Sequence, residues 1–208
     1  MKKYLFTFLA FILFTGTLAA QTIIGDCTVE YSIASVNGKN SLAGATKIFY
    51  VKGKLSRTDI RTTNFSQAII FNNATGNATI LKEVGNEKYI TPLNADQWKK
   101  ENEMYQGMSL KETAERKIIL GYNCIKAVAT LKDGTSFSYY FTKDITPTAS
   151  ENPYQFKDAG GFVLAYEAKG TGGNKITFTA TKINFDPVPA SLFDIPSSGY
   201  RLLPYANK

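Results

Sequence analysis

The sequence predicts a mainly β protein of the α+β class, in which a curved antiparallel sheet wraps one or two helices. Three observations support this prediction. Strand-length segments with alternating apolar and polar residues follow one another along most of the chain. Turns rich in glycine and asparagine separate these segments, and one segment near the middle has helical spacing. The chain contains no internal repeat and no low-complexity tract.

The first twenty residues have the pattern of a secretory signal peptide. Lys2 and Lys3 precede an apolar run over residues 4–14, and small residues end the segment at Ala20. The run is short for a membrane anchor, and no later segment approaches the length of a spanning helix. We therefore expect cleavage of residues 1–20 and export to the periplasm or the outer membrane, with no stable transmembrane anchor.

The remaining chain, residues 21–208, is long enough for one domain with a substantial core. The full sequence carries 24 basic and 17 acidic residues. Loss of residues 1–20 removes two lysines, which leaves 22 basic against 17 acidic residues and a net charge of +5. Because the basic residues are scattered through the predicted strands and turns, we expect no nucleic-acid binding.

Two cysteines, Cys27 and Cys124, remain in the mature chain. A redox thiol would favour a CxxC motif or a helix N-terminus, and a metal site would need more ligands; the sequence offers neither. An oxidising compartment favours a structural disulfide between the two. Such a bond would close a loop of about 97 residues and stabilise the fold by roughly 4 to 5 kcal/mol at most.

The first half of the mature chain reads as a series of strands. Apolar or small residues alternate with polar ones at Cys27, Val29, Tyr31 and Ile33, which is the period of a half-buried strand. Further strands are predicted between turn signals over residues 47–51, 55–62, 67–71, 78–83 and 88–91, the last ending before Pro92.

A β-hairpin is predicted in the second half. Its first strand covers residues 125–131, and Asp133 and Gly134 supply the positive φ angles of a tight turn. Aromatic residues alternate on the returning strand and on two later strands: Phe137, Tyr139, Phe141, Phe162, Tyr166 and Phe178. The alternation changes phase after Phe178, which predicts a β-bulge near residues 180–182.

One segment, residues 94–107, has helical character. Asn94 is a candidate N-cap, and Trp98 and Tyr105 fall on the apolar face. A second helix start is predicted at Ser109, because Ser109 and Glu112 have capping-box spacing. We expect these helices to bury an apolar face against the sheet.

Three groups of residues carry a resemblance to known exported proteins. They are Gly121, Tyr122, Asn123 and Cys124 leading into Lys132, Asp133 and Gly134; the strand start Gly160, Gly161, Phe162, Val163 and Leu164; and the ending Ala190, Ser191, Leu192, Phe193, Asp194, Ile195 and Pro196. Together they resemble uncharacterised exported families of the LolA-like, or lipoprotein-carrier-like, superfamily. The resemblance covers most of the mature chain. It implies an antiparallel sheet curled into an incomplete barrel, with helices over its concave apolar side, and it supplies no catalytic residue. The carriers proper move acylated lipoproteins through the periplasm, but none of their functional positions can be matched here.

Histidine is absent, which excludes Ser-His-Asp and Cys-His catalysis and the usual histidine-bearing metal sites. Acid–base chemistry would fall to carboxylates such as Glu101 and Glu103 or Glu112 and Glu115, but charges in a helical region usually form a solvated face. We therefore expect no enzyme activity, no cofactor and no metal. Arg57, Asp59 and Arg61 alternate on one strand and could hold an anionic head group, although a solvated strand face is the commoner reading.

Candidate binding residues are the aromatic and apolar side chains expected to face the concave side of the sheet. For any one of them, packing in the core is the commoner role. The candidates are Trp98, Tyr105, Phe137, Tyr139, Phe141, Phe162, Leu164, Tyr166 and Phe178.

Two functions follow from these expectations. The first is a non-enzymatic binding or carrier protein of the bacterial envelope that holds an acyl chain, a lipid or a lipidated protein in an apolar groove. The second is an interaction protein that docks another envelope protein through its sheet face or edge. The first predicts a continuous cavity, and the second predicts a packed interior with an exposed apolar patch or an unpaired edge strand.

Overall fold

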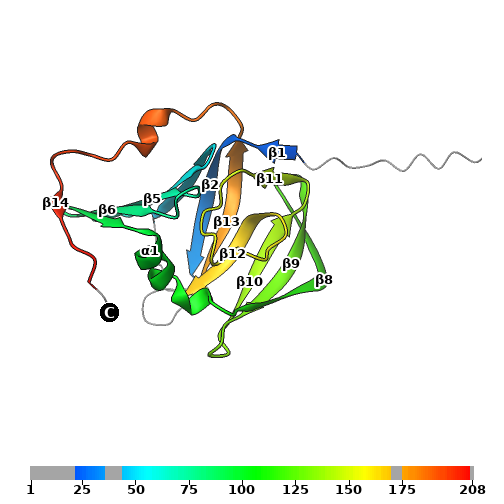
Figure 1. Ribbon diagram of the computed structural model, residues 1–208. Helices are drawn as coiled ribbons and strands as arrows, with labels where there is room; N and C mark the ends of the chain where they lie inside the picture. The colour runs from blue at the N-terminus through cyan, green and yellow to red at the C-terminus, as the bar shows by residue number, and fades with distance from the viewer. Residues whose placement is uncertain (1–21, 36–43, 170–174, 207–208) are drawn as a thin grey trace, which may run out of the picture.

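The computed structural model describes residues 22–35, 44–169 and 175–206 (Figure 1). The described helical segments are α1 (Ala95–Glu101) and the short 3-10 turns η1 (Glu103–Tyr105) and η3 (Ala190–Phe193). The strands are β1 (Thr22–Ile24), β2 (Asp26–Ser35), β3 (Thr46–Lys52), β4 (Leu55–Arg61), β5 (Phe65–Asn72), β6 (Ala78–Val84), β7 (Glu87–Leu93), β8 (Ser109–Ile119), β9 (Tyr122–Thr130), β10 (Ser136–Thr142), β11 (Ile145–Pro147), β12 (Phe162–Lys169), β13 (Lys175–Asn184) and β14 (Arg201–Leu202).

Twelve strands form one large curved sheet in the order β14-β7-β6-β5-β4-β3-β2-β13-β12-β10-β9-β8. Neighbours run antiparallel except for β14, which pairs parallel with β7. The sheet is open, because β14 and β8 lie at opposite ends of this order, and α1 lies on its inner side in Figure 1. A separate parallel pair joins β1 to β11. The predicted fold class, a mainly β curved antiparallel sheet with one α-helix, is confirmed.

The predicted strands agree with the structure because the alternation of the sequence matches the two faces of the sheet. In β2 the side chains of Cys27, Val29 and Tyr31 are buried on one face. The predicted bulge is present, since the register between β13 and β2 shifts between Ala180 and Lys182. Several strands run further than expected, and β7 continues through Pro92. Its outer neighbour β14 pairs with Tyr89 and Ile90, and proline is tolerated where no ladder bond is needed on that side.

The predicted helix is present but shorter. Asn94 caps α1 through a capping box, in which Asn94 Oδ1 accepts from the Gln97 N–H and Gln97 Oε1 accepts from the Asn94 N–H, both at 2.9 Å. The helix ends at Asn102, whose buried side chain donates to the Trp98 carbonyl at 2.8 Å. The 3-10 turn η1 carries the chain on to Gly107, which has a φ of 72°.

The second predicted helix is wrong. Residues from Ser109 form the strand β8, paired antiparallel with β9. The capping-box spacing at Ser109 is therefore coincidental, because cross-strand pairing with β9 decides the conformation of a polar segment that has no apolar helical stripe. Glu112 and Glu115 lie on this strand, where they pair with Lys143 and Lys126.

The concave face of the sheet is covered mainly by a loop. The resemblance implied that helices would cover this face, but α1 covers only the β5–β7 end, where Trp98 packs with Phe71, Ala78 and Leu93. Over the middle of the sheet lie residues 148–161, here called the crossing segment, which connect β11 to β12. Its Ala149 and Ala159 are buried in the main core. The half-barrel is therefore filled by irregular chain as well as by a helix.

The predicted disulfide is not formed. Cys27 on β2 and Cys124 on β9 are both free and fully buried in the main core. Three strands, β13, β12 and β10, separate β2 from β9 in the sheet. Strands lie about 4.8 Å apart, whereas a disulfide needs Cα atoms within about 7 Å. Although both cysteines lie in the same core, the three intervening strands hold them too far apart for a disulfide.

The expected signal peptide, residues 1–20, lies outside the described residues. Within the part of the chain that the structure describes, no helix has both the length and the apolar character needed to cross a bilayer.

Candidate functional site

The structure distributes the nine predicted binding residues over two packed clusters. Trp98 belongs to the cluster beneath α1, and Tyr105 packs against the edge of the main core. The other seven are buried in the main core: Phe137, Tyr139, Phe141, Phe162, Leu164, Tyr166 and Phe178.

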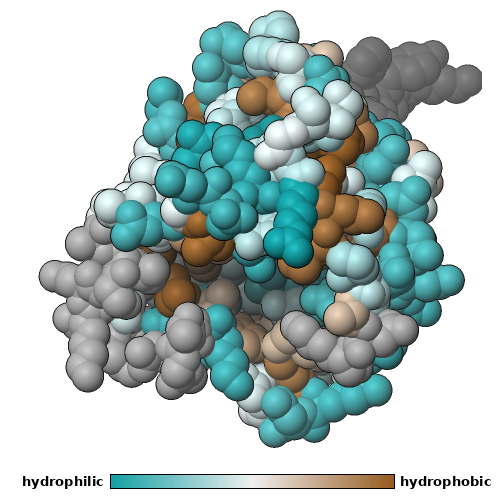
Figure 2. Space-filling view, turned by 90° about the vertical axis from the view of Figure 1, so that its left-hand side faces the viewer, coloured by the Kyte–Doolittle hydropathy of each residue, from teal (hydrophilic) through white to brown (hydrophobic). Residues whose placement is uncertain are grey.

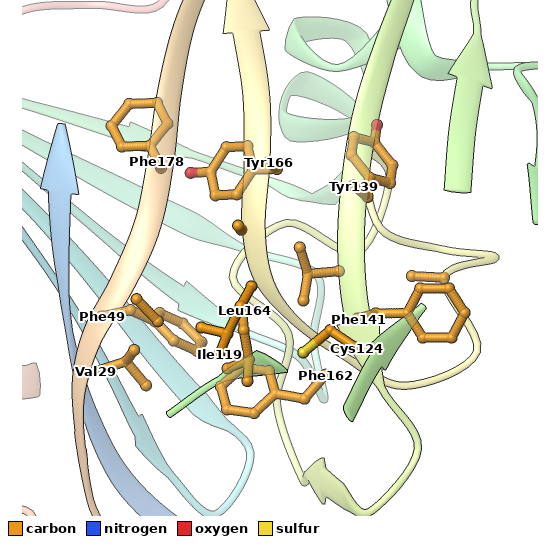
Figure 3. Close-up of a cluster of buried hydrophobic side chains, with 14 of the residues drawn as sticks. Val29, Phe49, Ile119, Cys124, Tyr139, Phe141, Phe162, Leu164, Tyr166 and Phe178 are labelled. Atoms are coloured by element: carbon orange, nitrogen blue, oxygen red, sulfur yellow. The ribbon is translucent and has the colours of Figure 1, made fainter. Parts of the chain in front are cut away.

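Three of these core residues form a row across neighbouring strands. Tyr139 on β10 is in register with Tyr166 on β12, which is in register with Phe178 on β13, and Figure 3 shows the three rings side by side. The Tyr166 and Phe178 rings are stacked with centroids 4.9 Å apart. Phe156 of the crossing segment meets Tyr139 and Tyr166 edge-on, at 5.4 and 5.0 Å. This row fills the middle of the concave face.

A lysine missed in the sequence lies at one end of this row. Lys47 on β3 is only 1 % exposed, and its ammonium lies 4.5 Å from the ring centroid of Tyr166, 4.6 Å from that of Phe178 and 4.7 Å from that of Tyr31. It is paired with Glu151 of the crossing segment and donates to the Tyr166 hydroxyl. The sequence did hold a signal, because Lys47 shares the inward parity of Phe49 and Val51 on the predicted strand.

Burial controls the ionisation of this cluster. It lowers the pKa of Lys47, and the nearby Glu151 carboxylate opposes that effect. Burial also raises the pKa of Tyr31 and of Tyr166, and Glu151 adds to both shifts. The cluster therefore holds one buried ion pair surrounded by neutral rings, an arrangement suited to fixing the crossing segment against the sheet.

Two cavities adjoin the concave face. One, of about 290 Å³, lies beneath the crossing segment and is bordered by Tyr31, Glu151, Phe156 and Phe162. The other, of about 340 Å³, lies between α1 and strands β5–β7 and is here called the α1 groove. Its lining residues are Gln67, Ile69, Ile80, Lys82, Tyr89, Thr91, Trp98, Glu101, Asn102, Asn152 and Leu203. Figure 2 shows a face of the molecule that is hollowed, with apolar side chains at the margin of the hollow.

The sheet positions that line the α1 groove follow directly from strand register. Ile69, Ile80 and Thr91 are paired neighbours on β5, β6 and β7, and Gln67, Lys82 and Tyr89 form the next row on the same face. The opposite wall consists of Trp98 and Asn102 from the end of α1. Asn152 Nδ2 donates to Asn102 Oδ1 at 2.7 Å and so joins this wall to the crossing segment.

Trp98, which lines this groove, carries an unpartnered polar atom. The side chain is 5 % exposed and its ring lies 6.0 Å from that of Phe71. Among the described residues, Trp98 Nε1 is the buried side-chain nitrogen or oxygen that has no hydrogen-bond partner. A buried N–H without an acceptor is uncommon and costs about 1 to 3 kcal/mol, so this atom is a candidate contact for a ligand.

Charge in the groove is unevenly placed. Lys82 is half-buried in the floor and, within residues 22–35, 44–169 and 175–206, takes part in no ion pair. Glu101 is exposed at the end of α1. The described residues contain no group of three or more histidine, cysteine, aspartate or glutamate side chains that could hold a metal ion.

Comparisons with known proteins bear on the fold alone. No protein-family model matches the chain, and no curated protein matches it. Two structures of PNGF-II are similar to 86 % and 87 % of this chain, with TM-scores of 0.51 and 0.53 and 16 % identity. The chain spans 31 % of the length of those proteins. At this identity the likeness shows a shared fold.

A weaker likeness exists to MucB, with a TM-score of 0.43 and 11 % identity over 83 % of this chain and 58 % of that one. MucB has also been solved in complex with MucA(peri), and that structure has a TM-score of 0.40. These values are too low to carry an argument. Membership of the LolA-like superfamily therefore stays a prediction from the sequence resemblance.

Proposed function

We propose that this chain is an exported, non-enzymatic binding protein of the bacterial envelope that holds an anionic amphiphile, such as a fatty acid, by its acyl chain in the α1 groove. The observation that carries the proposal is the apolar α1 groove lined by Lys82 and by Trp98, a residue whose buried N–H has no partner. Export rests on the signal-peptide pattern of residues 1–20, and a carrier role rests on the LolA-like resemblance.

The apolar part of the ligand is matched by the floor and walls of the groove. Ile69, Ile80, Trp98 and Leu203 supply aliphatic and aromatic surface, and a volume of about 340 Å³ is at the lower end of the usual range for small-molecule sites. The main core cannot serve this purpose without rearrangement, because the predicted aromatic residues there pack against one another and against Phe156.

The polar part of the ligand is matched by two donors. A carboxylate or phosphate near Lys82 would gain an ion pair, and an oxygen near Trp98 Nε1 would satisfy that N–H. Lys82 is the single cationic side chain among the residues that line the groove. A ligand with an anionic head group and an apolar chain would therefore match all three features: the apolar floor, the Lys82 ammonium and the Trp98 N–H.

Trp98 also provides the test, because it is the only tryptophan in the chain. Sodium dodecanoate, titrated below its micelle concentration, should shift the Trp98 emission and saturate at one ligand per protein. Lys82→Gln should weaken binding about tenfold, which corresponds to the loss of about 1.4 kcal/mol. Trp98→Phe keeps a ring but removes the N–H, and calorimetry should show affinity reduced by three- to tenfold.

Lys99→Gln is the matched control, because Lys99 is exposed on the same helix and does not line the groove. Its affinity for dodecanoate should equal that of the unmodified protein. Dodecyltrimethylammonium, with the same chain and a cationic head, should bind at least tenfold more weakly. Failure of dodecanoate to bind, or equal affinities in Lys82→Gln and Lys99→Gln, would overturn the proposal.

A second candidate is the docking of another envelope protein at the β8 edge of the sheet. The favouring observation is that β8 is a long terminal strand, Ser109–Ile119, with an exposed Ile118. It ranks second because a bulge interrupts β8 between Glu112 and Arg116, and the Arg116 side chain occupies the carbonyls of Thr113 and Glu115, which protects an edge against pairing. A photo-crosslinker placed at Ile118, in cells that produce the protein, should capture one stoichiometric partner if this role is real.

A further inference from the structure

A third cavity lies mainly on the other face of the sheet from the α1 groove. It has a volume of about 540 Å³ and is here called the outer pocket. It lies over strands β4–β6, on the face covered by the chain that follows β13. Its lining residues are Arg57, Asp59, Arg61, Thr62, Thr63, Asn64, Phe65, Ser66, Gln67, Ala68, Leu81, Glu83, Gly85, Asn86 and Tyr200.

Strand register builds the floor of the outer pocket. Asp59, Ala68 and Leu81 are paired neighbours on β4, β5 and β6, and Arg61, Ser66 and Glu83 form the adjacent row. The sequence pattern of alternating charges on β4 therefore does not mark a simple solvated face. It places charged groups at the bottom and rim of a defined cavity.

The wall of the outer pocket is fastened to this floor from the C-terminal part of the chain. Arg57 donates to the Leu192 carbonyl, and the Tyr200 hydroxyl donates to Glu83 Oε1 at 2.6 Å. Val188 and Phe193 are buried against Ala68, Ile70 and Leu81 on the same face. The pocket is thus formed before any ligand arrives, which lowers the entropic cost of binding.

The charges of the outer pocket are paired with one another. Arg57 Nε lies 2.6 Å from Asp59 Oδ1, a second Arg57 nitrogen lies 3.2 Å from Oδ2, and Arg61 approaches the same carboxylate at 3.4 Å. Asp59 is 5 % exposed. Glu83 is held by Lys88 and Tyr200. At the floor of the pocket, an anionic ligand would have to displace the buried Asp59 from Arg57, and a cation would have to compete with both arginines. Arg61, whose side chain is 66 % exposed, lies at the rim.

From this arrangement we infer that the outer pocket binds a neutral carbohydrate. A sugar hydroxyl both donates and accepts, so two neighbouring hydroxyls can bond to a carboxylate and a guanidinium that are already paired, without breaking the pair. The pocket rim adds short hydroxyl and amide groups: Thr62, Thr63, Asn64, Ser66 and Asn86. Phe65 and Tyr200 add rings against which the apolar face of a sugar can pack.

The outer pocket and the α1 groove lie mainly on opposite faces of β5 and β6, and Gln67 borders both. Ala68 and Leu81 face the outer pocket, whereas Ile69 and Ile80 face the groove. Both can be occupied at once. A protein with both sites could hold an amphiphile while attached to a glycan surface.

The experiment is calorimetric titration of the purified chain with four neutral disaccharides, namely maltose, cellobiose, lactose and N,N′-diacetylchitobiose, up to 20 mM. At least one should bind at one site per protein. Inorganic phosphate and glucose 1-phosphate are the anionic comparators, and we expect neither to bind. If none of the four sugars binds, or if a phosphate binds in their place, the inference is overturned.

Variants locate the site. Asn86 lies in an exposed turn, and Asn86→Ala should reduce the affinity for the bound sugar at least threefold. Tyr200→Ala should reduce it more than tenfold. Tyr200→Phe keeps the ring and should lose less sugar affinity than Tyr200→Ala, and thermal unfolding of both variants separates loss of the sugar contact from destabilisation of the C-terminal segment. Lys99→Gln, exposed on α1 and outside both cavities, should bind sugar like the unmodified protein. Sugar affinity unchanged in both Asn86→Ala and Tyr200→Ala would place the sugar elsewhere and reject the inference.

Discussion

Lys47 and Glu151 form an ion pair inside the curved sheet, and this pair joins β3 to the crossing segment across the concave face. The lysine is 1 % exposed and the glutamate side chain 14 %. The same ammonium lies over three aromatic rings from β2, β12 and β13. The middle of the half-barrel is therefore closed by one electrostatic contact within an aromatic cluster, while the α1 end keeps an open groove.

Removal of either partner of this pair should destabilise the fold strongly. Lys47→Met leaves Glu151 in the core without its cation, and Glu151→Gln leaves the ammonium without its anion; each should lower the free energy of unfolding by about 3 to 5 kcal/mol. The double variant should lose less than the two single losses combined, by at least about 1 kcal/mol. Urea unfolding of the four proteins measures this coupling, and strictly additive losses would show that the pair does not act as a unit.

The cysteine thiols should be free and unreactive in the folded protein. Burial raises the pKa of Cys27 to about 12 and that of Cys124 to about 11, and a thiol rather than a thiolate is a poor nucleophile. A thiol reagent at pH 8 should therefore modify neither residue until guanidinium is added, when it should count two thiols without any reductant. A count of zero would restore the disulfide that the sequence predicts.

Alkaline pH should lower the free energy of unfolding, because the pKa values of Cys27 and Cys124 are raised in the folded state. A folded-state pKa above the unfolded value means that the folded state holds its proton longer, so this stabilisation is complete below about pH 9 and is lost towards pH 12. Tyr31, Tyr139 and Tyr166 have raised pKa values and add losses of the same sign above pH 10. The lowered pKa of Lys47 acts in the opposite direction. Unfolding free energy measured from pH 8 to 11 should fall. Cys27→Ala should remove about half of the fall between pH 9 and 10, because Cys124 contributes the other half.

Gly161 should tolerate no side chain. A Cβ there would lie 2.1 Å from the Thr142 carbonyl oxygen and 2.8 Å from its carbon, both backbone atoms. Gly161→Ala should therefore cost more than about 3 kcal/mol, the upper range of overpacking in a core. Gly25→Ala is the matched control, because a Cβ at Gly25 meets nothing within 4 Å and no positive φ is involved. Similar melting temperatures for the two variants would contradict the close approach of β12 to β10.

The N-cap of α1 should contribute to both stability and ligand binding. Asn94→Ala removes one half of the capping box and should lower the free energy of unfolding by about 1 kcal/mol. Because the frayed helix would loosen the Trp98 wall, dodecanoate affinity should fall as well. Asp96→Asn, which keeps the capping box and changes a first-turn charge, should lose only a few tenths of a kcal/mol. The measurement is thermal unfolding combined with the Trp98 fluorescence titration.

Local sequence patterns predicted the structure correctly where the conformation of a segment depends on neighbouring residues alone. The alternation in β2, the bulge between Ala180 and Lys182 and the cap at Asn94 all depend on a few neighbouring residues. The predicted hairpin turn is confirmed in part: Gly134 has a φ of 84°, but Asp133 does not have the positive φ predicted for it. The Ser109 capping-box pattern failed because a helix start also needs an apolar stripe behind it, and β8 instead has a strand partner in β9.

The sequence by itself therefore determined most of the strands, the start of α1 and the mainly β antiparallel class of this protein, because side-chain period and turn chemistry are local properties. Tertiary structure alone decided three further matters. Strand order kept Cys27 and Cys124 in separate strands of one core, burial of β3 turned Lys47 into an ion-pair partner of Glu151, and the path of the crossing segment filled the predicted aromatic groove and left the open one beside Trp98. Each of the three depends on contacts between segments that are far apart in the sequence. The curvature of the sheet determines these contacts, and no single stretch of sequence does.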